Sequence, residues 1–305
     1  MKNLMIKSIN KTYKKGAVKA NIDITTTFFS GEIVALVGHN GAGKTTLLNQ
    51  IIGNAKPDSG DIVYQGKSFV TNSKFARANI SMMPQFYAPL NGVTLTQSIK
   101  SVLQIRGVKS KDIDYYSSRI IKELDIEKYK DISGDKLSGG LQRLTSFAMA
   151  VAKPSHIILL DEPTNDVDPV RRKLIWRHLR KLAEKGHVVV IVTHNLLEVE
   201  QYADRFLMFE QGKLIKDSAT GTNKAFSHTL IVDTDDIELL TSDDLPLYRQ
   251  KKYNKEDGQF IFTLSLNQVN NATNWLVKMI EEGKITGYRL SPSSLEVSYG
   301  GNDDE

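Results

Sequence analysis

Apolar and polar positions alternate between strand-like and helix-like spacing over the first two thirds of the chain. Residues 4–30 alternate strictly enough to predict β-structure, with a turn at 14–16. Short apolar runs follow, separated by stretches of helical periodicity. The predicted strands lie at 33–37, 61–70, 80–83, 151–161 (with an apolar core at 157–160), 188–193, 206–209 and 213–216. The predicted helices lie at 44–52, 95–130, 141–152, 169–185 and 198–202. Strands that alternate with helices predict an α/β fold with a mainly parallel sheet and helices on both faces.

The pattern changes near residue 220, where Thr220–Asn223 is typical of a linker. Beyond it the sequence predicts strands and helices of a small α+β unit, at 229–232, 235–240, 260–265, 272–282 and 285–290. We therefore expect a large domain over residues 1–218, a linker at 219–226, a small accessory domain at 227–299 and a disordered tail at 300–305.

Composition narrows the class of protein. The 305 residues are 40% hydrophobic, enough to build a core, and contain no cysteine, which excludes disulfides and thiolate metal sites. The N-terminus lacks the apolar core of a signal peptide. The longest apolar runs fall far short of the ~20 residues that span a bilayer. We expect a protein that is soluble or reaches a membrane only through partners.

Charge is distributed unevenly along the chain. Residues 226–305 hold 7 Lys and Arg against 14 Asp and Glu, a net charge of −7, whereas residues 1–225 carry +12. A basic body suits polyphosphate or an anionic membrane face. Basic residues interleaved with aromatic ones would favour nucleic acid, and no such patch is present, so we expect no specific nucleic-acid partner. Scattered solvated lysines explain the excess equally well.

The segment after the first apolar run, Gly38-His39-Asn40-Gly41-Ala42-Gly43-Lys44-Thr45, fits G-x-x-x-x-G-K-[ST], a loop that cradles nucleotide phosphates. Glycines let main-chain N–H groups approach phosphate oxygens, and the following helix adds the positive end of its dipole. Lys44 can reach the β- and γ-phosphates, and the Thr45 hydroxyl can bind Mg²⁺. The alternative is a glycine-rich turn. The predicted nucleotide-binding residues are Gly38, Asn40, Gly41, Ala42, Gly43, Lys44, Thr45 and Thr46.

A second buried strand, 157–160, ends in two acids, Asp161 and Glu162. In a phosphate-binding site Asp161 can hold Mg²⁺ directly or through water. Glu162 is then placed to accept a proton from the water that attacks the γ-phosphate. Taken alone, the pair is better explained as a strand ending in two solvated acids.

Two further segments favour the catalytic interpretation. Leu137–Arg143, LSGGLQR, resembles the signature sequence of ATP-binding-cassette (ABC) ATPases, and His194 matches the switch histidine of that family. The resemblance covers residues 1 to about 218 and is carried by an ordered set: Tyr13, Gly38–Thr46, Gln85, Ser138–Gly140, Asp161-Glu162, Asp168 and His194. It implies a P-loop NTPase fold with an N-terminal antiparallel β-subdomain and a helical signature subdomain at about 87–152.

The resemblance also implies roles and cofactors, ATP and Mg²⁺. Tyr13 would stack on adenine, and His194 would hold the γ-phosphate. Gln85 would contact Mg²⁺ and the lytic water and sense a transmembrane partner. The expected metal ligands are Thr45, Gln85 and Asp161, and the expected catalytic residues are Glu162, His194 and Gln85.

The same family resemblance implies a head-to-tail dimer. ATP would lie between the P-loop of one copy and the signature residues of the other, Ser138, Gly139, Gly140 and Gln142. Asp168 would help to bridge the two domains. The departures are His39, where proline or serine is common, and Leu141, where glutamine is more usual. Neither removes a phosphate or metal contact, so we expect an active ATPase.

The leading hypothesis is the ATP-hydrolysing subunit of an exporter, attached to the cytoplasmic face of the cell membrane by separate transmembrane permease subunits. Residues 86–90, FYAPL, are of the type that lines the groove for a coupling helix, although a buried loop is an equal alternative. The segment 291–299 is similar to an ending found on ATPase subunits of drug, antibiotic and peptide exporters.

Two alternatives stay open, an importer subunit and a soluble ABC ATPase of translation, DNA repair or iron–sulfur assembly. Translation factors usually carry two cassettes, and repair ATPases a long coiled-coil insert, neither of which is seen here. An assembly ATPase would normally lack the acidic extension. That extension could regulate turnover, form a dimer surface or be inert, and its acidity argues mildly against self-association.

Overall fold

The computed structural model describes residues 2–13, 17–85, 92–220, 227–234, 250–254, 258–265 and 268–292. The chain divides into two compact units. The first comprises Met1–Asn195 and Tyr202–Ser218, and the second comprises Leu196–Gln201 and Ala219–Glu305. Each unit is described by itself.

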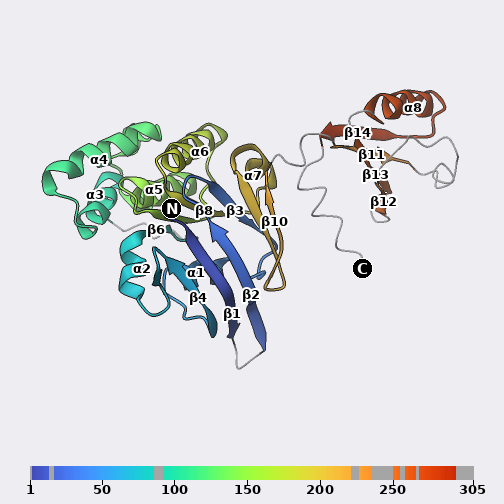
Figure 1. Cartoon of the computed structure of the whole chain (residues 1–305). Coiled ribbons are helices and arrows are strands. Elements are labelled where there is room, and N and C mark those ends of the chain that lie inside the picture. Colours follow the sequence, from blue (N-terminus) through green and yellow to red (C-terminus); the bar gives the residue numbers. More distant parts are fainter. Residues whose placement is uncertain are drawn as a thin grey trace. The chain divides into compact units, whose positions relative to one another are not determined.

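Strands and helices alternate along the first part of the chain (Figure 1). The strands are β1 (Leu4–Tyr13), β2 (Val18–Phe28), β3 (Ile33–Val37), β4 (Ser59–Tyr64), β5 (Lys67–Ser68), β6 (Ile80–Met83), β7 (Ile157–Asp161), β8 (Val188–Val192), β9 (Arg205–Glu210) and β10 (Lys213–Ala219). The helices are α1 (Lys44–Ile51), α2 (Ser73–Asn79), α3 (Leu95–Ile105), α4 (Ser110–Glu123), α5 (Gly139–Val151), α6 (Pro169–Glu184) and α7 (Leu196–Tyr202), with short 3-10 turns η2 (Glu127–Tyr129) and η3 (Gly134–Lys136).

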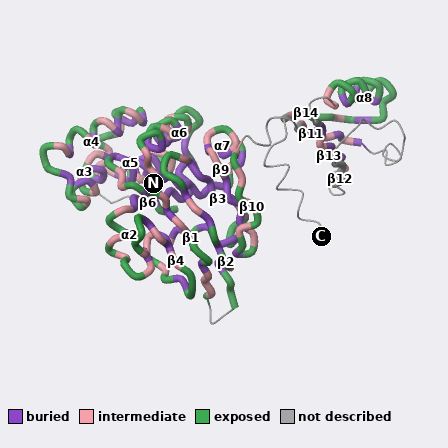
Figure 2. The backbone as a smooth tube through the Cα atoms, viewed as in Figure 1, coloured by how far each residue is buried: buried purple, intermediate pink, exposed green. Residues whose placement is uncertain are grey.

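A six-stranded sheet forms the centre of the first unit, in the order β10-β9-β3-β8-β7-β6. The pairs β3–β9, β3–β8, β8–β7 and β7–β6 are parallel. Every residue of β3, β7 and β8 is buried, because both faces of the sheet are covered, and this is why their sequences are continuous apolar runs (Figure 2). Val192 at the end of β8 pairs with both Leu36 and Asp161, so the carboxyl ends of β3, β7 and β8 meet at one edge.

A smaller antiparallel sheet, in the order β2-β1-β4-β5, packs against the central one. One hydrophobic cluster contains residues of both sheets together with Leu47 and Leu48 of α1. The predicted α/β fold with an N-terminal antiparallel β-subdomain is therefore confirmed. Leu47 and Leu48 of α1 are buried in this cluster, and the N-terminal end of the helix, at Lys44, follows the phosphate-binding loop.

The helical segment between β6 and β7 differs from its prediction in detail. The single helical stretch at 95–130 is two helices, α3 and α4, because Gly107 has a left-handed φ of 72° that ends the first of them. Thr94 starts α3 with a capping box closed by Gln97. Helix α2 was not predicted, because Ala76 is its one buried residue and so no apolar periodicity marks it.

The second unit contains an antiparallel sheet in the order β12-β13-β11-β14, formed by β11 (Ser227–Asp233), β12 (Gln250–Asn254), β13 (Gln259–Ser265) and β14 (Gly287–Pro292). Helix α8 (Val269–Glu281) covers one face of it with Trp275, Leu276 and Met279. Strand β12 was not predicted. The predicted helix at 235–240, residues 221–226 of the linker, the apolar stretch 86–90, residues 293–299 of the export-type ending and the tail at 300–305 lie outside the described residues.

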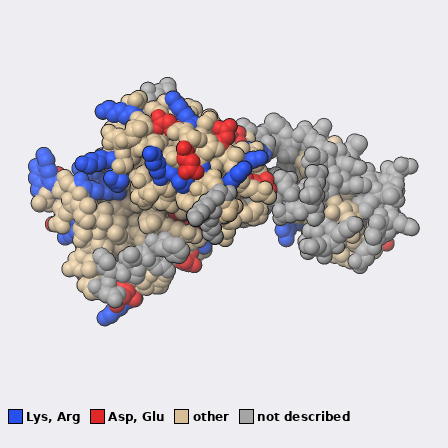
Figure 3. All heavy atoms as spheres, turned by 90° about the horizontal axis from the view of Figure 1, so that it is seen from below, with Lys and Arg blue, Asp and Glu red and all other residues tan. Residues whose placement is uncertain are grey.

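Two surface properties bear on function. Within the described part of the chain, no helix is both long and apolar enough to cross a bilayer. In the space-filling view, basic side chains are spread over the visible face of the first unit and are interspersed with acidic ones (Figure 3). On that face the positive charge is not gathered into a single patch of the kind that binds a polyanion.

Candidate nucleotide-binding site

The loop between β3 and α1 ends at a helix N-terminus that is suited to anions. Helix α1 begins at Lys44. Its N-cap is Gly43, a residue with no side chain to cap the first N–H groups of the helix. The first N–H groups of a helix have no intrahelical acceptor, and the helix dipole places positive charge beside them. The start of α1 can therefore bind phosphate through main-chain N–H groups.

Strand β2 fixes the position of Gly43. Its φ is +105°, and a Cβ at this position would lie 2.1 Å from the carbonyl oxygen of Ala20. The buried Asn21 side chain donates a hydrogen bond of 3.2 Å to the Gly43 carbonyl. Only glycine meets both demands, left-handed backbone and contact with β2. No motif in the sequence singles out Asn21.

Lys44 is turned back onto its own loop. Its Nζ donates to the carbonyl oxygens of Gly38 at 2.5 Å and His39 at 2.9 Å. The residue is 7% exposed, and this burial lowers the pKa of Lys44, while the charges of Glu162 and Asp161 act in the opposite direction. A buried ammonium group that contacts only neutral carbonyls is stabilised when an anion binds beside it.

Thr45 and Asp161 meet across the gap between α1 and β7. The Thr45 hydroxyl donates to Oδ2 of Asp161 at 3.1 Å. Burial raises the pKa of Asp161, and the Thr45 hydrogen bond and the Lys44 charge oppose that rise. A hydroxyl and a carboxylate side by side fit Mg²⁺, which takes oxygen ligands and keeps waters and substrate phosphates in its shell. Among the described residues, no group of three or more histidine or acidic side chains is arranged to hold a metal ion.

Glu162 follows Asp161 in a left-handed conformation, with φ of 52°. Its N–H donates to the carbonyl of Val192, which fixes it to the end of β8. A hydrogen bond of 3.0 Å joins its Oε1 to Nδ1 of His194. Among the described residues its buried Oε2 has no hydrogen-bond partner. The carboxylate is thus oriented through one oxygen and has the other available to accept a proton.

Tyr13 lies at the end of β1 and is 39% exposed. Asp58 holds this end of the strand, because its carboxylate accepts from Lys11 Nζ at 2.9 Å and from the Thr12 N–H at 2.7 Å. Lys11 Nζ lies 5.3 Å from the centre of the Tyr13 ring. A half-exposed aromatic ring in this setting can stack on a base. Asp58 was not singled out from the sequence.

The segment Leu137–Arg143 forms the start of helix α5, as predicted for the helical insert. Ser138 is its N-cap and makes no side-chain capping hydrogen bond. Gln142 Nε2 donates to the Gly134 carbonyl at 2.9 Å, and the buried Arg143 guanidinium donates to the carbonyl of Gln85. The Gln85 residue itself is exposed. Gly140 packs so closely on the loop after β7 that a Cβ would lie 2.4 Å from the Asp166 carbonyl oxygen.

Sequence comparison identifies the class of ATPase domain. Residues 22–165 match the family model described as "ABC transporter". The chain is 31% identical over 208 residues to the Nod factor export ATP-binding protein I of Sinorhizobium fredii, with 68% of this chain and 60% of that protein covered. It belongs to the ABC transporter ATP-binding family. This confirms the family predicted from the signature segment and His194.

Other relatives show how far the likeness extends. Human ATP-binding cassette sub-family A member 10 is 29% identical over 308 residues, which cover 96% of this chain. The chain spans only about a fifth of that relative, 20% of its length. A solved dimeric bacterial ABC transporter cassette is 26% identical, with a TM-score of 0.65, and covers 71% of this chain and 98% of its own. The fold of the first unit is that of ABC cassettes.

The structure brings five of the predicted ABC site residues together at the carboxyl edge of the central sheet: Lys44, Thr45, Asp161, Glu162 and His194. Tyr13 contacts Lys11 at the end of β1. Gln85 is joined to α5 through Arg143, and Gly140 at the start of α5 packs on the loop that leads to Asp168. Asp168 is the N-cap of α6, and its side chain accepts from the Arg171 N–H. Asn21, Asp58, Arg143 and Arg171 hold these groups in place, and no pattern in the sequence distinguishes them from other polar residues.

Proposed function

We propose that the chain is an ATP-hydrolysing subunit that dimerises around MgATP and drives export through separate transmembrane permease subunits. The observation that carries the proposal is the shared edge of β3, β7 and β8. There a phosphate-binding helix start, a hydroxyl–carboxylate pair and an oriented glutamate lie beside one another. A structural turn would need none of these.

Each residue has a defined task in this proposal. The first turn of α1 and Lys44 bind the β- and γ-phosphates of ATP. Thr45 and Asp161, with Gln85, would hold Mg²⁺, which when bound neutralises charge that develops on the phosphates. Glu162 accepts the proton of the attacking water through Oε2. His194 fixes the other oxygen of that carboxylate and reaches the γ-phosphate from its exposed side.

Dimerisation follows from the second anion site. The N-terminus of α5, with the Ser138 hydroxyl not used as a cap, offers N–H and O–H donors for a γ-phosphate. These donors lie at the start of α5, whereas Lys44 lies at the start of α1, so we propose that they serve the ATP of a second copy. The solved relative that is named a dimeric cassette supports this arrangement.

The names of relatives support the direction of transport. One group of relatives is named for Nod factor export, and a further human relative, 29% identical over 209 residues, is named a retinal-specific phospholipid-transporting ATPase. A drug, antibiotic or peptide is the cargo class that the sequence suggests, and cargo contacts would lie on the permease subunits. These subunits would hold the chain at the cytoplasmic face of the membrane, with Gln85 next to them. The acidic second unit would contact the assembly or restrain turnover.

The first experiment replaces Glu162 by Gln in the full chain. ATP hydrolysis is expected to fall by roughly 10²- to 10⁴-fold, because the general base is lost while the side-chain shape is kept. Size-exclusion chromatography with excess MgATP should then show a dimer. The exposed Glu184→Gln on α6 is the matched control and should hydrolyse ATP at the wild-type rate. Wild-type turnover in Glu162→Gln would overturn the catalytic assignment.

A second experiment tests transport. The chain is tagged at native level, cells are solubilised in mild detergent, and co-purifying proteins are identified by mass spectrometry. One or two polytopic membrane proteins are expected. Ribosomal, nucleic-acid or assembly-scaffold partners would overturn the transporter proposal in favour of a soluble ABC ATPase.

A further inference from the structure

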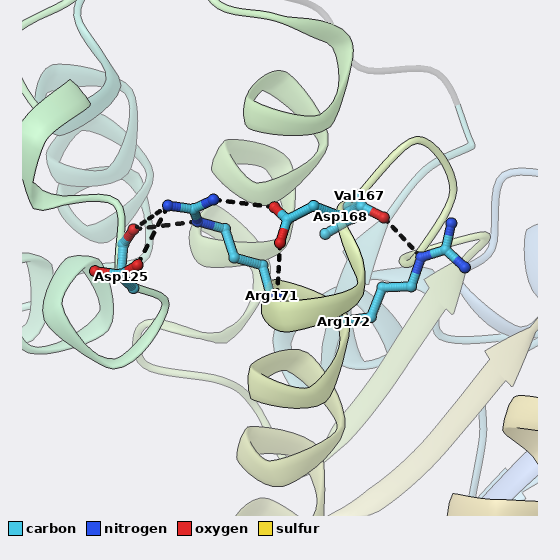
Figure 4. Close-up of polar contacts among 5 residues, drawn as sticks. All are labelled: Asp125, Val167, Asp168, Arg171 and Arg172. Atoms are coloured by element: carbon cyan, nitrogen blue, oxygen red, sulfur yellow. Dashed lines mark hydrogen bonds and ion pairs between the residues drawn. The ribbon is translucent and has the colours of Figure 1, made fainter.

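We propose that Arg171 is a positioning residue that couples the end of helix α4 to the Asp168 loop, so that the catalytic dimer forms only when the helical segment is in place. This rests on the proposed ATPase function. Arg171 lies in the first turn of α6. Its guanidinium lies between Asp168, at the start of the same helix, and Asp125, which is 46 residues before Arg171 in the sequence (Figure 4).

One side of Arg171 holds Asp168. The Arg171 N–H donates to Oδ1 of Asp168 at 3.1 Å, and Nη1 of the guanidinium contacts Oδ2 at 3.0 Å. Both carboxylate oxygens are therefore engaged by the same residue. Burial tends to raise the pKa of Asp168, but the Arg171 hydrogen bonds outweigh it and the pKa is lowered. The carboxylate stays charged and fixed in orientation.

The other side of Arg171 holds the end of α4. Nε and Nη2 donate to the Asp125 carbonyl oxygen at 3.2 and 2.9 Å, and Nη2 contacts the Asp125 carboxylate at 3.3 Å. Asp125 lies just past the helix, with a left-handed φ of 53°. The Asp125 carbonyl follows the C-terminus of α4, where the helix dipole places negative charge, so a planar cation fits there. The guanidinium also lies 5.9 Å from the centre of the Tyr129 ring.

The loop before Asp168 is held on its remaining sides. Arg172 Nε donates to the Val167 carbonyl at 2.6 Å (Figure 4), and Gly140 of α5 contacts the Asp166 carbonyl without room for a Cβ. A second contact joins the same helices further along. Nδ1 of His178 on α6 lies 2.6 Å from Oε2 of Glu123 on α4. Movement of α4 against α6 must therefore shift Asp168 or break the Arg171 contacts.

Lysine cannot replace this bridge. An ammonium group at position 171 can keep the ion pair with Asp168, and the main-chain N–H that caps Asp168 is unchanged. A lysine side chain lacks the planar guanidinium fork that reaches the Asp125 carbonyl at the same time. Arg171→Lys thus separates the coupling from the local capping role.

The test measures kcat and KM for ATP, together with thermal unfolding, in wild-type full-length chain, Arg171→Lys and Arg171→Gln. Exposed Arg177→Gln on the same helix is the matched control. We expect kcat of Arg171→Lys to fall by roughly tenfold with an unchanged KM, because ATP contacts are intact while the loop is misplaced. Arg171→Gln should lose more, and Arg177→Gln should match wild type.

A second readout uses the Glu162→Gln background, in which MgATP should produce a dimer. Adding Arg171→Lys should raise the ATP concentration needed for half-dimerisation without weakening binding of fluorescent ATP. Wild-type kcat and dimerisation in Arg171→Lys would overturn the coupling and leave a local capping role. Failure of the proposed function is distinguishable, because wild type would then not hydrolyse ATP and Glu162→Gln would not dimerise.

Discussion

The two halves of the nucleotide site are held in place by different means. The phosphate-binding loop between β3 and α1 is fixed by contacts to its main-chain atoms. Lys44 Nζ and the Asn21 amide donate to its carbonyl oxygens, and Gly43 packs against the Ala20 carbonyl. The segment from Asp161 to Arg172 is fixed by side chains from distant positions, including His194, Asp125 and Thr45. The first requires the absence of a side chain at Gly43, and the second requires side chains that are distant in the sequence.

This difference separates binding from coupling. The contacts named for the phosphate-binding loop come from β2 and from the loop's own residues, so the loop can present the same phosphate site whatever the helical segment does. A loop held by Arg171 and contacted by α5 changes whenever those helices move. ATP binding and ATP-driven assembly can thus respond to different substitutions.

The largest effect is expected from Gly43→Ala. The new Cβ would meet the Ala20 carbonyl at 2.1 Å in a left-handed backbone, and strained backbone costs roughly 1–3 kcal/mol before the clash is added. Urea unfolding should show the loss of stability, and titration with fluorescent ATP should show loss of binding. Gly41→Ala is the control for strain, since its φ is +85° and nothing lies within 4 Å of an added Cβ. Equal stability of the two variants would contradict the role of the β2 contact.

Gly140→Ala should instead leave binding intact and break coupling. Its Cβ would lie 2.4 Å from the Asp166 carbonyl, so α5 and the loop must separate, at a cost of about 1–3 kcal/mol. We expect wild-type affinity for fluorescent ATP together with loss of hydrolysis and of the MgATP-dependent dimer in Glu162→Gln. Undiminished turnover would show that the close packing of α5 on this loop is not needed.

A smaller effect is expected at Asp168. Replacing it by Ala removes the N-cap of α6 and should lower the free energy of unfolding by about 1 kcal/mol. Asp168→Asn keeps an oxygen for the Arg171 N–H and should recover most of that stability, measured by urea unfolding. Turnover should stay low in both variants, because the ion pair with Nη1 of Arg171 is lost in each.

The smallest effect is a pH dependence of stability at the α4–α6 contact. Burial lowers the pKa of His178, although the nearby Glu123 charge opposes this, and Arg119 and Lys181 add to the lowering. Its Nε2 is buried without a hydrogen-bond partner in the described structure, and its ring packs edge-on against Phe147. The folded protein therefore holds the neutral imidazole.

The sign of that dependence follows from proton uptake. The unfolded chain binds a proton at His178 near its ordinary pKa of 6.5, while the folded chain resists it, so stability is full above that value and falls as pH drops below it. Thermal unfolding from pH 7.5 to 5 should show a shallower decline for His178→Asn, whose amide can still donate to Glu123. An unchanged slope would assign the decline to other groups.

Sequence patterns predicted the elements that are buried on both faces. Strands β3, β7 and β8 are continuous apolar runs because helices and sheet cover both faces, and the phosphate loop is contiguous in the chain. Helix α2 and strand β12 were missed: α2 has Ala76 as its one buried residue, and Gln250–Asn254 carries no apolar alternation. Local patterns predict an element only where buried apolar residues recur at regular spacing. Helix α2 buries a single residue, and the sequence of β12 shows no such spacing.

The amino-acid sequence alone determined the phosphate-binding loop, the acids after β7 and the ABC family, because each depends on residues that are neighbours in the chain or occur in a fixed order. Tertiary structure alone decided which oxygen of Glu162 is oriented, that Asn21 supports Gly43, and that Arg171 joins Asp125 to Asp168. These contacts link positions tens of residues apart, and a long-range partner leaves no local periodicity from which it can be predicted.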